Sequence, residues 1–184
     1  MDNVLLVVDM LNDFILPEGR LSFPQGQAVV APIATLRAAF RAAGDVIVYD
    51  NDAHPENSEE FAVWPPHCVM GTPGARVVDA LTPGPGDVTF HKDALSLFEH
   101  THAEALLRSL VGNTGRLYVA GVATEYCVKE AVLGARARGF AVTVVADAIA
   151  GVELEPGNCE KAIAAMRAAG AEFASVADVL ERRA

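Results

Sequence analysis

Residues 3–10 read NVLLVVDM, a run of apolar residues that ends at an aspartate. Leu and Val follow one another here without alternating polar residues. A strand of this composition is buried on both faces, which is typical of parallel sheets covered by helices. The stretch therefore indicates the first strand of an α/β fold.

Similar short runs recur along the chain and alternate with segments of helical period. Further strands are expected at residues 45–49, 87–91, 116–120, 141–146 and 172–175. Helices are expected at residues 28–43, 102–111, 124–139 and 158–169, and Ser175 and Asp178 would cap a last one. This alternation predicts a single three-layer α/β domain over residues 1–184, with a six-stranded parallel sheet and helices on both faces.

The overall charge excludes some partners. The formal net charge is −10, and no basic stripe offsets it, so we expect neither nucleic acid nor a membrane as a partner.

No apolar run reaches the ~20 residues that span a bilayer. The start, Met1-Asp2-Asn3, lacks the basic region of a signal peptide. The expected location is the cytoplasm.

Chemistry-bearing residues stand at the ends of the expected strands, where ligands of such sheets bind. Asp9 closes the first strand, Lys92 follows the third, and Cys127 lies just inside the helix after the fourth. Burial can raise a carboxyl pKa into a range useful for proton transfer. A helix N-terminus and a nearby ammonium both favour a thiolate, and free N–H groups there could hold an oxyanion. Taken singly, Asp9 and Lys92 fit ordinary structural roles better; their common location favours a catalytic site.

The number of cysteines also points to a reactive thiol. The chain has Cys68, Cys127 and Cys159, an odd number that argues against a disulfide framework. One reactive thiol with two buried or incidental ones is a reasonable division.

The irregular loop of residues 50–72 carries a second constellation. Asp52 and His54 share a face of an extended segment, and His67 follows on the same loop. An aspartate and two histidines can bind zinc, manganese or iron and leave positions open for water or substrate. Glu60 or Glu59 could complete the set, and we prefer Glu60. Solvated loop residues explain most isolated Asp-x-His pairs, so the second histidine is what favours a metal.

Over nearly its whole length the chain resembles the isochorismatase-like cysteine hydrolases. The resemblance rests on VVDMLNDF (residues 7–14), FHKDALSLF (residues 90–98) and above all GVATEYCV (residues 121–128), which looks like the family's nucleophile motif. It implies an Asp-Lys-Cys triad of Asp9, Lys92 and Cys127 on a six-stranded parallel sheet. It also implies a cis peptide between Val122 and Ala123, and an oxyanion hole made by the N–H groups of Ala123 and Cys127.

Two further blocks, DNDAHP (residues 50–55) and WPPHCVMGTPGA (residues 64–75), are similar to the nicotinamidase and pyrazinamidase branch. There the equivalents of Asp52, His54 and His67 bind one divalent metal ion (Zn, Mn or Fe), often with a glutamate near Glu60. The implied reaction converts nicotinamide to nicotinate and ammonia through a thioester. The implied partner is a small aromatic amide.

The resemblance and the residue types together suggest a substrate pocket. We expect Phe14, Trp64, Val122 and Phe98 in it, with Phe14 and Trp64 able to sandwich a flat ring. Two departures touch this pocket: the family commonly has an aromatic residue near Ser96 or Leu97, and the loop between His54 and His67 is short.

Three alternative functions make different demands on the sequence. A nucleotide-dependent oxidoreductase needs a glycine-rich turn after the first strand, and residues 9–13 (DMLND) have no glycine. A non-catalytic metal-binding protein predicts an unreactive Cys127. An amidase of the same fold could act on another small amide or a carbamoyl group. The Ala-rich helices would allow a homo-oligomer, and would pack equally well within one domain.

Overall fold

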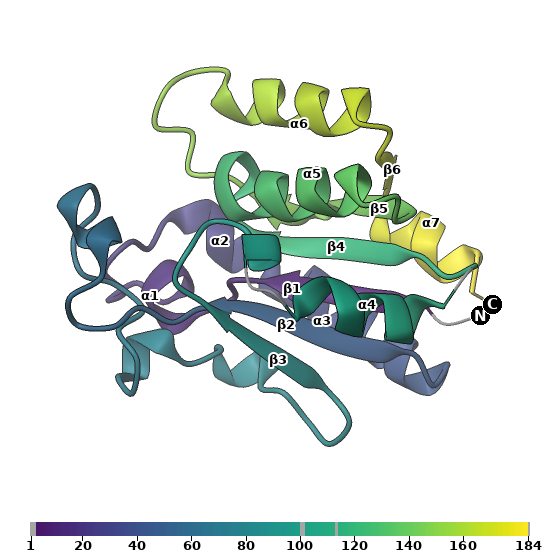
Figure 1. The fold of residues 1–184 in the computed structure, drawn as a ribbon, viewed down its shortest axis with the longest axis horizontal. Helices are drawn as coiled ribbons and strands as arrows, with labels where there is room; N and C mark the ends of the chain where they lie inside the picture. Colours follow the sequence, from purple (N-terminus) through teal and green to yellow (C-terminus); the bar gives the residue numbers. More distant parts are fainter. Residues whose placement is uncertain (1–2, 100–101, 113, 184) are drawn as a thin grey trace.

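The computed structural model describes residues 3–99, 102–112 and 114–183. Six parallel strands form one sheet in the order β3-β2-β1-β4-β5-β6 (Figure 1). Their bounds are β1 Val4–Val8, β2 Val46–Asp52, β3 Val88–Lys92, β4 Leu117–Val122, β5 Val142–Ala150 and β6 Glu172–Ala174. The predicted α/β fold with a six-stranded parallel sheet is confirmed.

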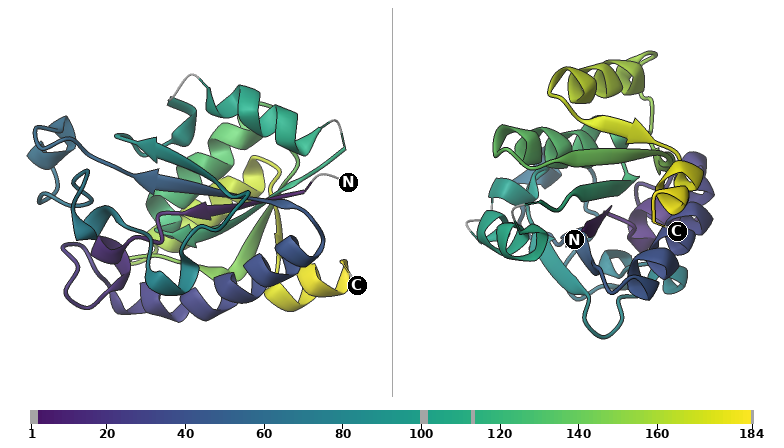
Figure 2. Two further views of the ribbon diagram at one scale, coloured as in Figure 1. Left: turned by 90° about the horizontal axis from the view of Figure 1, so that it is seen from below. Right: turned by 90° about the vertical axis from the view of Figure 1, so that its right-hand side faces the viewer.

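Helices cover both faces of the sheet, as Figures 1 and 2 show. α4 (Ala103–Val111) and α5 (Lys129–Ala137) lie on one face, and α6 (Asn158–Ala168) packs outside α5. α2 (Pro24–Ala28), α3 (Val30–Ala42) and α7 (Val176–Glu181) lie on the other face. A short helix, α1 (Asn12–Ile15), follows β1.

The central strand β1 explains why this sequence folds in three layers. All five of its residues are buried. Alternate side chains point to opposite faces, so Leu6 and Val8 pack with α4 and α5, while Leu5 and Val7 pack with α3. Each such side chain stabilises the fold by about 1.5–3 kcal/mol through burial. An alternating polar pattern would have exposed one face to water.

The structure differs from the sequence prediction at several element ends. The predicted helix at residues 28–43 is α3, Val30–Ala42, and the short helix α2 that precedes it was not predicted. β2 continues to Asp52 because its polar end still pairs with β3, up to Asp52 opposite Lys92. The predicted helix at residues 124–139 is kinked at Tyr126, whose φ and ψ are −118° and −110°, and the regular helix α5 begins at Lys129. The predicted cap of the last helix is confirmed as a reciprocal pair between Ser175 and Asp178. None of the helices in the described ranges combines the length and hydropathy that crossing a bilayer requires.

Candidate active site

The sequence-predicted residues meet where the strand order reverses. β1 lies between β2 and β4, so the chain leaves its carboxyl end with neighbours on both sides. Asp9 follows β1, Asp52 and Lys92 end β2 and β3 side by side, and Cys127 lies in the turn after β4. In open parallel sheets this switch point forms the binding crevice.

A buried ion-pair network joins Asp9, Lys92 and Asp52. The Lys92 ammonium donates to both carboxylate oxygens of Asp9, at 3.0 and 2.8 Å, and to Oδ1 of Asp52. The backbone N–H of Asp52 donates to Oδ1 of Asp9 at 2.7 Å. Asp9 and Lys92 are each only 1% exposed. The network fixes the Asp9 carboxylate from two neighbouring strands.

The charges in this network shift the pKa values of its members. Burial and the charge of Asp52 raise the pKa of Asp9 to about 6, against the opposing effect of Lys92. Burial alone would lower the pKa of Lys92, but Asp50, Asp52 and Asp9 outweigh it and raise that pKa well above its ordinary value. Asp50 is fully buried 3.9 Å from Lys92, and burial raises its pKa to about 8. Lys92 is therefore a cation, and Asp9 is poised to exchange a proton.

Cys127 lies beside this network. Its sulfur and one carboxylate oxygen each of Asp9 and Asp52 all lie within 4.8 Å of one another. Burial and the nearby carboxylates raise the pKa of Cys127 well above its ordinary value, although Lys92 opposes them. The sequence led us to expect a thiolate favoured by Lys92 and the helix end. Lys92 favours the thiolate as expected, but burial outweighs it, so the raised pKa of Cys127 favours the neutral thiol beside the Asp9 carboxylate.

The backbone before Cys127 is tightly constrained. The predicted cis peptide between Val122 and Ala123 is confirmed. Gly121 has φ 126°, and a Cβ at this position would lie 2.0 Å from the carbonyl oxygen of Val8. Only glycine lets β4 approach β1 this closely. The approach brings the turn with Cys127 next to Asp9 at the end of β1.

The candidate metal ligands also come together. One donor atom each from Asp52, His54 and His67 lies within a group whose members are at most 4.8 Å apart, and all three residues are buried. Nδ1 of His67 contacts the carbonyl oxygen of Pro65 at 2.9 Å, and Nδ1 of His54 contacts Oδ1 of Asp93 at 2.6 Å. These contacts leave the Nε2 atom of each ring for another ligand.

An unsatisfied atom tests whether a metal ion fits this group. Nε2 of His54 is buried without a hydrogen-bond partner, 3.6 Å from Oδ2 of Asp52. Two ligands of one transition-metal ion, each about 2 Å from it, lie about 3–4 Å apart. A buried polar atom without a partner costs stability, and a metal ion would satisfy it. The residues present therefore fit a divalent metal.

The structure does not bring Glu60 into this group. Its Oε2 lies 3.7 Å from Nδ1 of His54, the ring nitrogen that Asp93 already engages. Asp93 is in turn held by the Ser58 hydroxyl, at 2.6 Å. Sequence reasoning missed Asp93, which orients His54 from β3's end of the sheet.

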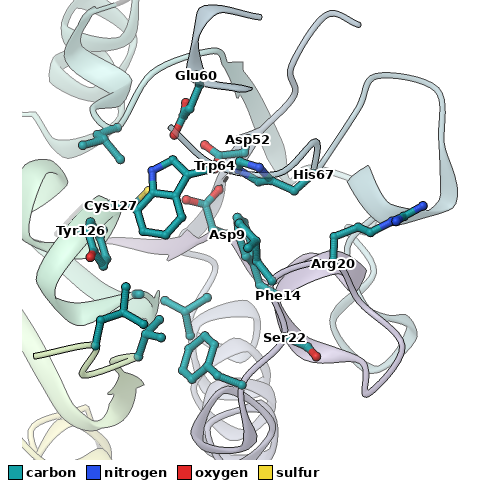
Figure 3. Close-up of a pocket in the computed structure, with 17 residues that line it drawn as sticks. Asp9, Phe14, Arg20, Ser22, Asp52, Glu60, Trp64, His67, Tyr126 and Cys127 are labelled. Carbon is teal, nitrogen blue, oxygen red and sulfur yellow. Dashed lines mark hydrogen bonds between the residues drawn. The ribbon is translucent and has the colours of Figure 1, made fainter. Parts of the chain in front are cut away.

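A pocket of about 310 Å³ opens beside Cys127 (Figure 3). This volume is in the range of small-molecule sites. The predicted residues Phe14, Trp64 and Val122 line it, together with Asp9, Asp52, Glu60, His67, Ala123 and Cys127. Trp64 meets Tyr126 edge to face, with ring centroids 5.6 Å apart.

Phe98 lies elsewhere, contrary to our expectation. Its ring packs against Phe140, at 6.3 Å between centroids, and under the guanidinium of Arg138. It also lies directly over Gly134 of α5. Phe98 is thus a core residue between α4 and α5 and is not among the pocket residues.

Sequence reasoning missed several of the pocket residues. They are Arg20, Leu21, Ser22, Phe23, Leu95, Tyr126, Val152 and Leu154. Most lie on two loops that are distant in the chain, one before α2 and one after β5. Tyr126 was the one that the nucleophile motif could have suggested, because it directly precedes Cys127.

Comparisons with known proteins agree with this geometry. Residues 3–178 match the isochorismatase domain family. The chain is 31% identical to a nicotinamidase from Escherichia coli (strain K12), over 95% of each chain. It resembles the crystal structure of a pyrazinamidase of Pyrococcus horikoshii in complex with zinc, with TM-score 0.85, 35% identity and coverage of 95% and 99%. It also resembles an N-carbamoylsarcosine amidase from Thermoplasma acidophilum, with TM-score 0.84, 30% identity and coverage of 96% and 97%.

Proposed function

Because the chain belongs to the isochorismatase family, we propose that it is a nicotinamidase that hydrolyses nicotinamide to nicotinate and ammonia with Cys127 as the nucleophile. One observation carries the proposal: the Cys127 thiol shares a pocket with aromatic side chains and with Asp52 and His67, which form a candidate metal group with His54. A thiol nucleophile suits an amide substrate, and aromatic side chains suit a flat ring. A metal ion bound by the group could hold a nitrogen atom of that ring.

The first half of the reaction forms a thioester. The Cys127 thiol gives its proton to Asp9 as the sulfur attacks the carboxamide carbon. Lys92 stabilises the negative charge of the Asp9–Cys127 pair, since its ammonium already contacts Asp9. The N–H groups of Ala123 and Cys127 hold the oxyanion of the tetrahedral intermediate. Asp9 then protonates the departing ammonia, and the thioester remains.

The second half returns the enzyme to its starting state. Asp9, now ionised again, removes a proton from a water molecule that attacks the thioester carbon. The carbon–sulfur bond breaks, nicotinate leaves, and Asp9 returns the proton to the sulfur. A carboxyl whose pKa is about 6 can both accept and return a proton near neutral pH.

Asp52, His54 and His67 would hold the metal ion. When bound, a divalent ion would act as a Lewis acid toward the pyridine nitrogen and so orient the carboxamide. The protein's own residues do the rest of the positioning. Trp64, Phe14 and Asp9 line the same pocket (Figure 3), so the two aromatic side chains would contact the ring of a flat substrate.

The proposal is tested by ammonia release from nicotinamide, with pyrazinamide in parallel. The purified protein is assayed as isolated, after chelation, and after Zn, Mn or Fe is added back. Cys127→Ala is the control for background release. We expect release that needs both a metal and Cys127.

A different result would redirect the assignment within the family. The same assays should include N-carbamoylsarcosine, because the chain also resembles an amidase for that compound. Release from that carbamoyl compound and none from nicotinamide under any metal would overturn the nicotinamidase proposal. The cysteine-hydrolase chemistry would stand in that case.

A further inference from the structure

The segment after β5, residues 151–155, forms one wall of the pocket. Val152 and Leu154 both line it, and Leu154 is 59% exposed. Val152 packs partly against the core, but the exposed Leu154 adds little to this packing. Polar contacts of the backbone therefore contribute to the position of the segment.

Glu125 supplies these contacts. Its side chain is buried, with 6% of the residue exposed. Oε1 accepts hydrogen bonds from the backbone N–H groups of Val152 at 2.9 Å and Glu153 at 2.7 Å. Oε2 lies 3.4 Å from the thiol sulfur of Cys159, which donates to it. A buried carboxylate needs such donors, and bonds to an ionised acceptor are the stronger kind.

The segment has little freedom to take another path. A Cβ at Gly151 would lie 2.1 Å from the sulfur of Cys159 and 2.4 Å from Oε2 of Glu125. Glu153 has φ 55°, and its carboxylate accepts from the N–H groups of Gly157 and Cys159, at the start of α6. Hydrogen bonds to Glu125 on one side and to the start of α6 on the other therefore hold the wall segment.

Glu125 lies two residues before Cys127 in the same turn. Tyr126, between them, lines the pocket and meets Trp64 (Figure 3). The Glu125 carboxylate instead accepts hydrogen bonds from the wall segment. Thr124–Val128 therefore connects the nucleophile to the wall. Trp64, the wall residues Val152 and Leu154, and Cys127 all line this one pocket.

We propose that Glu125 is a positioning residue that holds residues 152–154 in place as a pocket wall, and that it thereby sets the affinity for ring-bearing amides. The claim about affinity for ring-bearing amides rests on the proposed function, whereas the claim about the position of the wall does not. Glu125 acts through the backbone of Val152 and Glu153 and does not touch the reacting atoms.

The test compares two variants with a matched control. Glu125→Met fills a similar space without an acceptor, whereas Glu125→Gln keeps an amide oxygen that can accept both N–H groups. Glu130→Met is the control, since Glu130 lies nearby on α5 and pairs with Lys129 instead. Hydrogen exchange of the backbone amides and steady-state kinetics with nicotinamide are measured for all three and for the wild-type holoenzyme.

We expect the amides of Val152 and Glu153 to exchange more slowly than those of Leu154 and Glu155 in the wild-type protein. In Glu125→Met their exchange should be at least about tenfold faster. KM for nicotinamide should rise by about ten- to one-hundred-fold while kcat changes by less than about threefold. Glu125→Gln and Glu130→Met should stay close to the wild type.

Two results would overturn the proposal. One is unchanged exchange at Val152 and Glu153 in Glu125→Met. The other is a fall in kcat at constant KM, which would assign Glu125 to the nucleophile turn alone. If Glu125→Met does not fold, fast exchange of both amides in the wild type or a raised KM in Glu125→Gln would contradict it. Absence of ammonia release by the wild-type protein counts against the proposed function only, because the exchange measurement needs no substrate.

Discussion

Lys92 donates to both oxygens of the Asp9 carboxylate, at 3.0 and 2.8 Å, deep in the protein. It is also the ammonium that Asp52 contacts, and Asp50 lies 3.9 Å away. One cation thus faces three buried carboxyl groups. Its removal would leave them without compensation in a region of low dielectric constant.

We therefore expect Lys92→Met to lose both stability and activity. The free energy of unfolding should fall by about 3–5 kcal/mol, the usual cost of breaking a buried ion pair by removing one partner. Ammonia release should fall by about 10²–10³-fold, because the thiol would lose the charge that stabilises its ionised form. Urea unfolding with an unchanged m-value and the ammonia assay check the two effects.

The double variant Asp9→Asn with Lys92→Met separates coupling from general damage. If the ion pair is the cause, the double variant should be more stable than the sum of the two single effects predicts. Strictly additive losses would contradict the coupling between Asp9 and Lys92.

The histidine pair gives a prediction about metal content. His54→Ala and His67→Ala should each bind Zn or Mn at least about 10²-fold more weakly. Asp93→Asn should weaken binding by about 10–100-fold, because Asp93 fixes the ring of His54. Elemental analysis and calorimetric titration measure this without reference to activity.

Glu60 provides the contrast within the same loop. Its carboxylate lies on the Nδ1 side of His54, so Glu60→Gln should weaken metal binding less than Asp93→Asn does. Metal binding unaffected by either histidine substitution would rule out this group as the metal site.

Trp64 and Phe98 test the outline of the pocket. Trp64→Ala should raise KM for nicotinamide by about tenfold or more, because the pyridine ring of the substrate would lose one of its aromatic neighbours. Phe98→Leu should leave KM unchanged and lower stability by about 1–2 kcal/mol, as a shape change in the core. Steady-state kinetics and thermal unfolding of both variants decide; an equal rise in KM for Phe98→Leu would restore it to the pocket.

The sequence was sufficient to predict the parallel sheet and the catalytic candidates at the carboxyl ends of its strands. Continuous apolar runs mark strands buried on both faces, and parallel strands bring their carboxyl ends to one edge. Asp9, Lys92 and Cys127 could therefore be expected together although they lie far apart in the chain. The contact between Asp52 and Lys92 was not predicted, because we placed Asp52 in the loop after the second strand, whereas β2 continues to Asp52 opposite Lys92.

The features that the sequence did not predict depend on contacts between segments that are distant in the chain. Val152 and Leu154 reach the pocket only because Glu125 and α6 fix their segment, and no local period records that contact. Phe98 follows the Lys92 segment in sequence but turns to the core between α4 and α5. The pKa of Cys127 rises because burial outweighs the nearby ammonium, and burial depends on the whole fold.

Two glycines with positive φ separate a steric clash from backbone strain. Gly121→Ala would place a Cβ 2.0 Å from the carbonyl oxygen of Val8 in the centre of the sheet, whereas at Gly86 no atom lies within 4 Å. We expect Gly86→Ala to cost about 1 kcal/mol from backbone strain alone. Gly121→Ala should cost at least about 2 kcal/mol more, because β1 and β4 must move apart. Urea unfolding of both variants measures the difference, and equal costs would refute the close approach.

Tyr49 should make stability depend on alkaline pH. Its hydroxyl donates to the carbonyl oxygen of Leu81 at 2.8 Å, and burial raises its pKa from 10.0 to about 12. The folded state thus keeps the phenol neutral where the unfolded chain ionises it. The contribution of Tyr49 is complete below pH 10 and is lost as the pH rises toward 12. Tyr49→Phe, which cannot ionise, should be less stable than the wild type near pH 9 because it leaves the Leu81 carbonyl oxygen unpaired. That difference should shrink or reverse by about pH 11.5, as urea unfolding at the two pH values would measure. An equal difference at both would mean that Tyr49 ionises alike in the folded and unfolded chain.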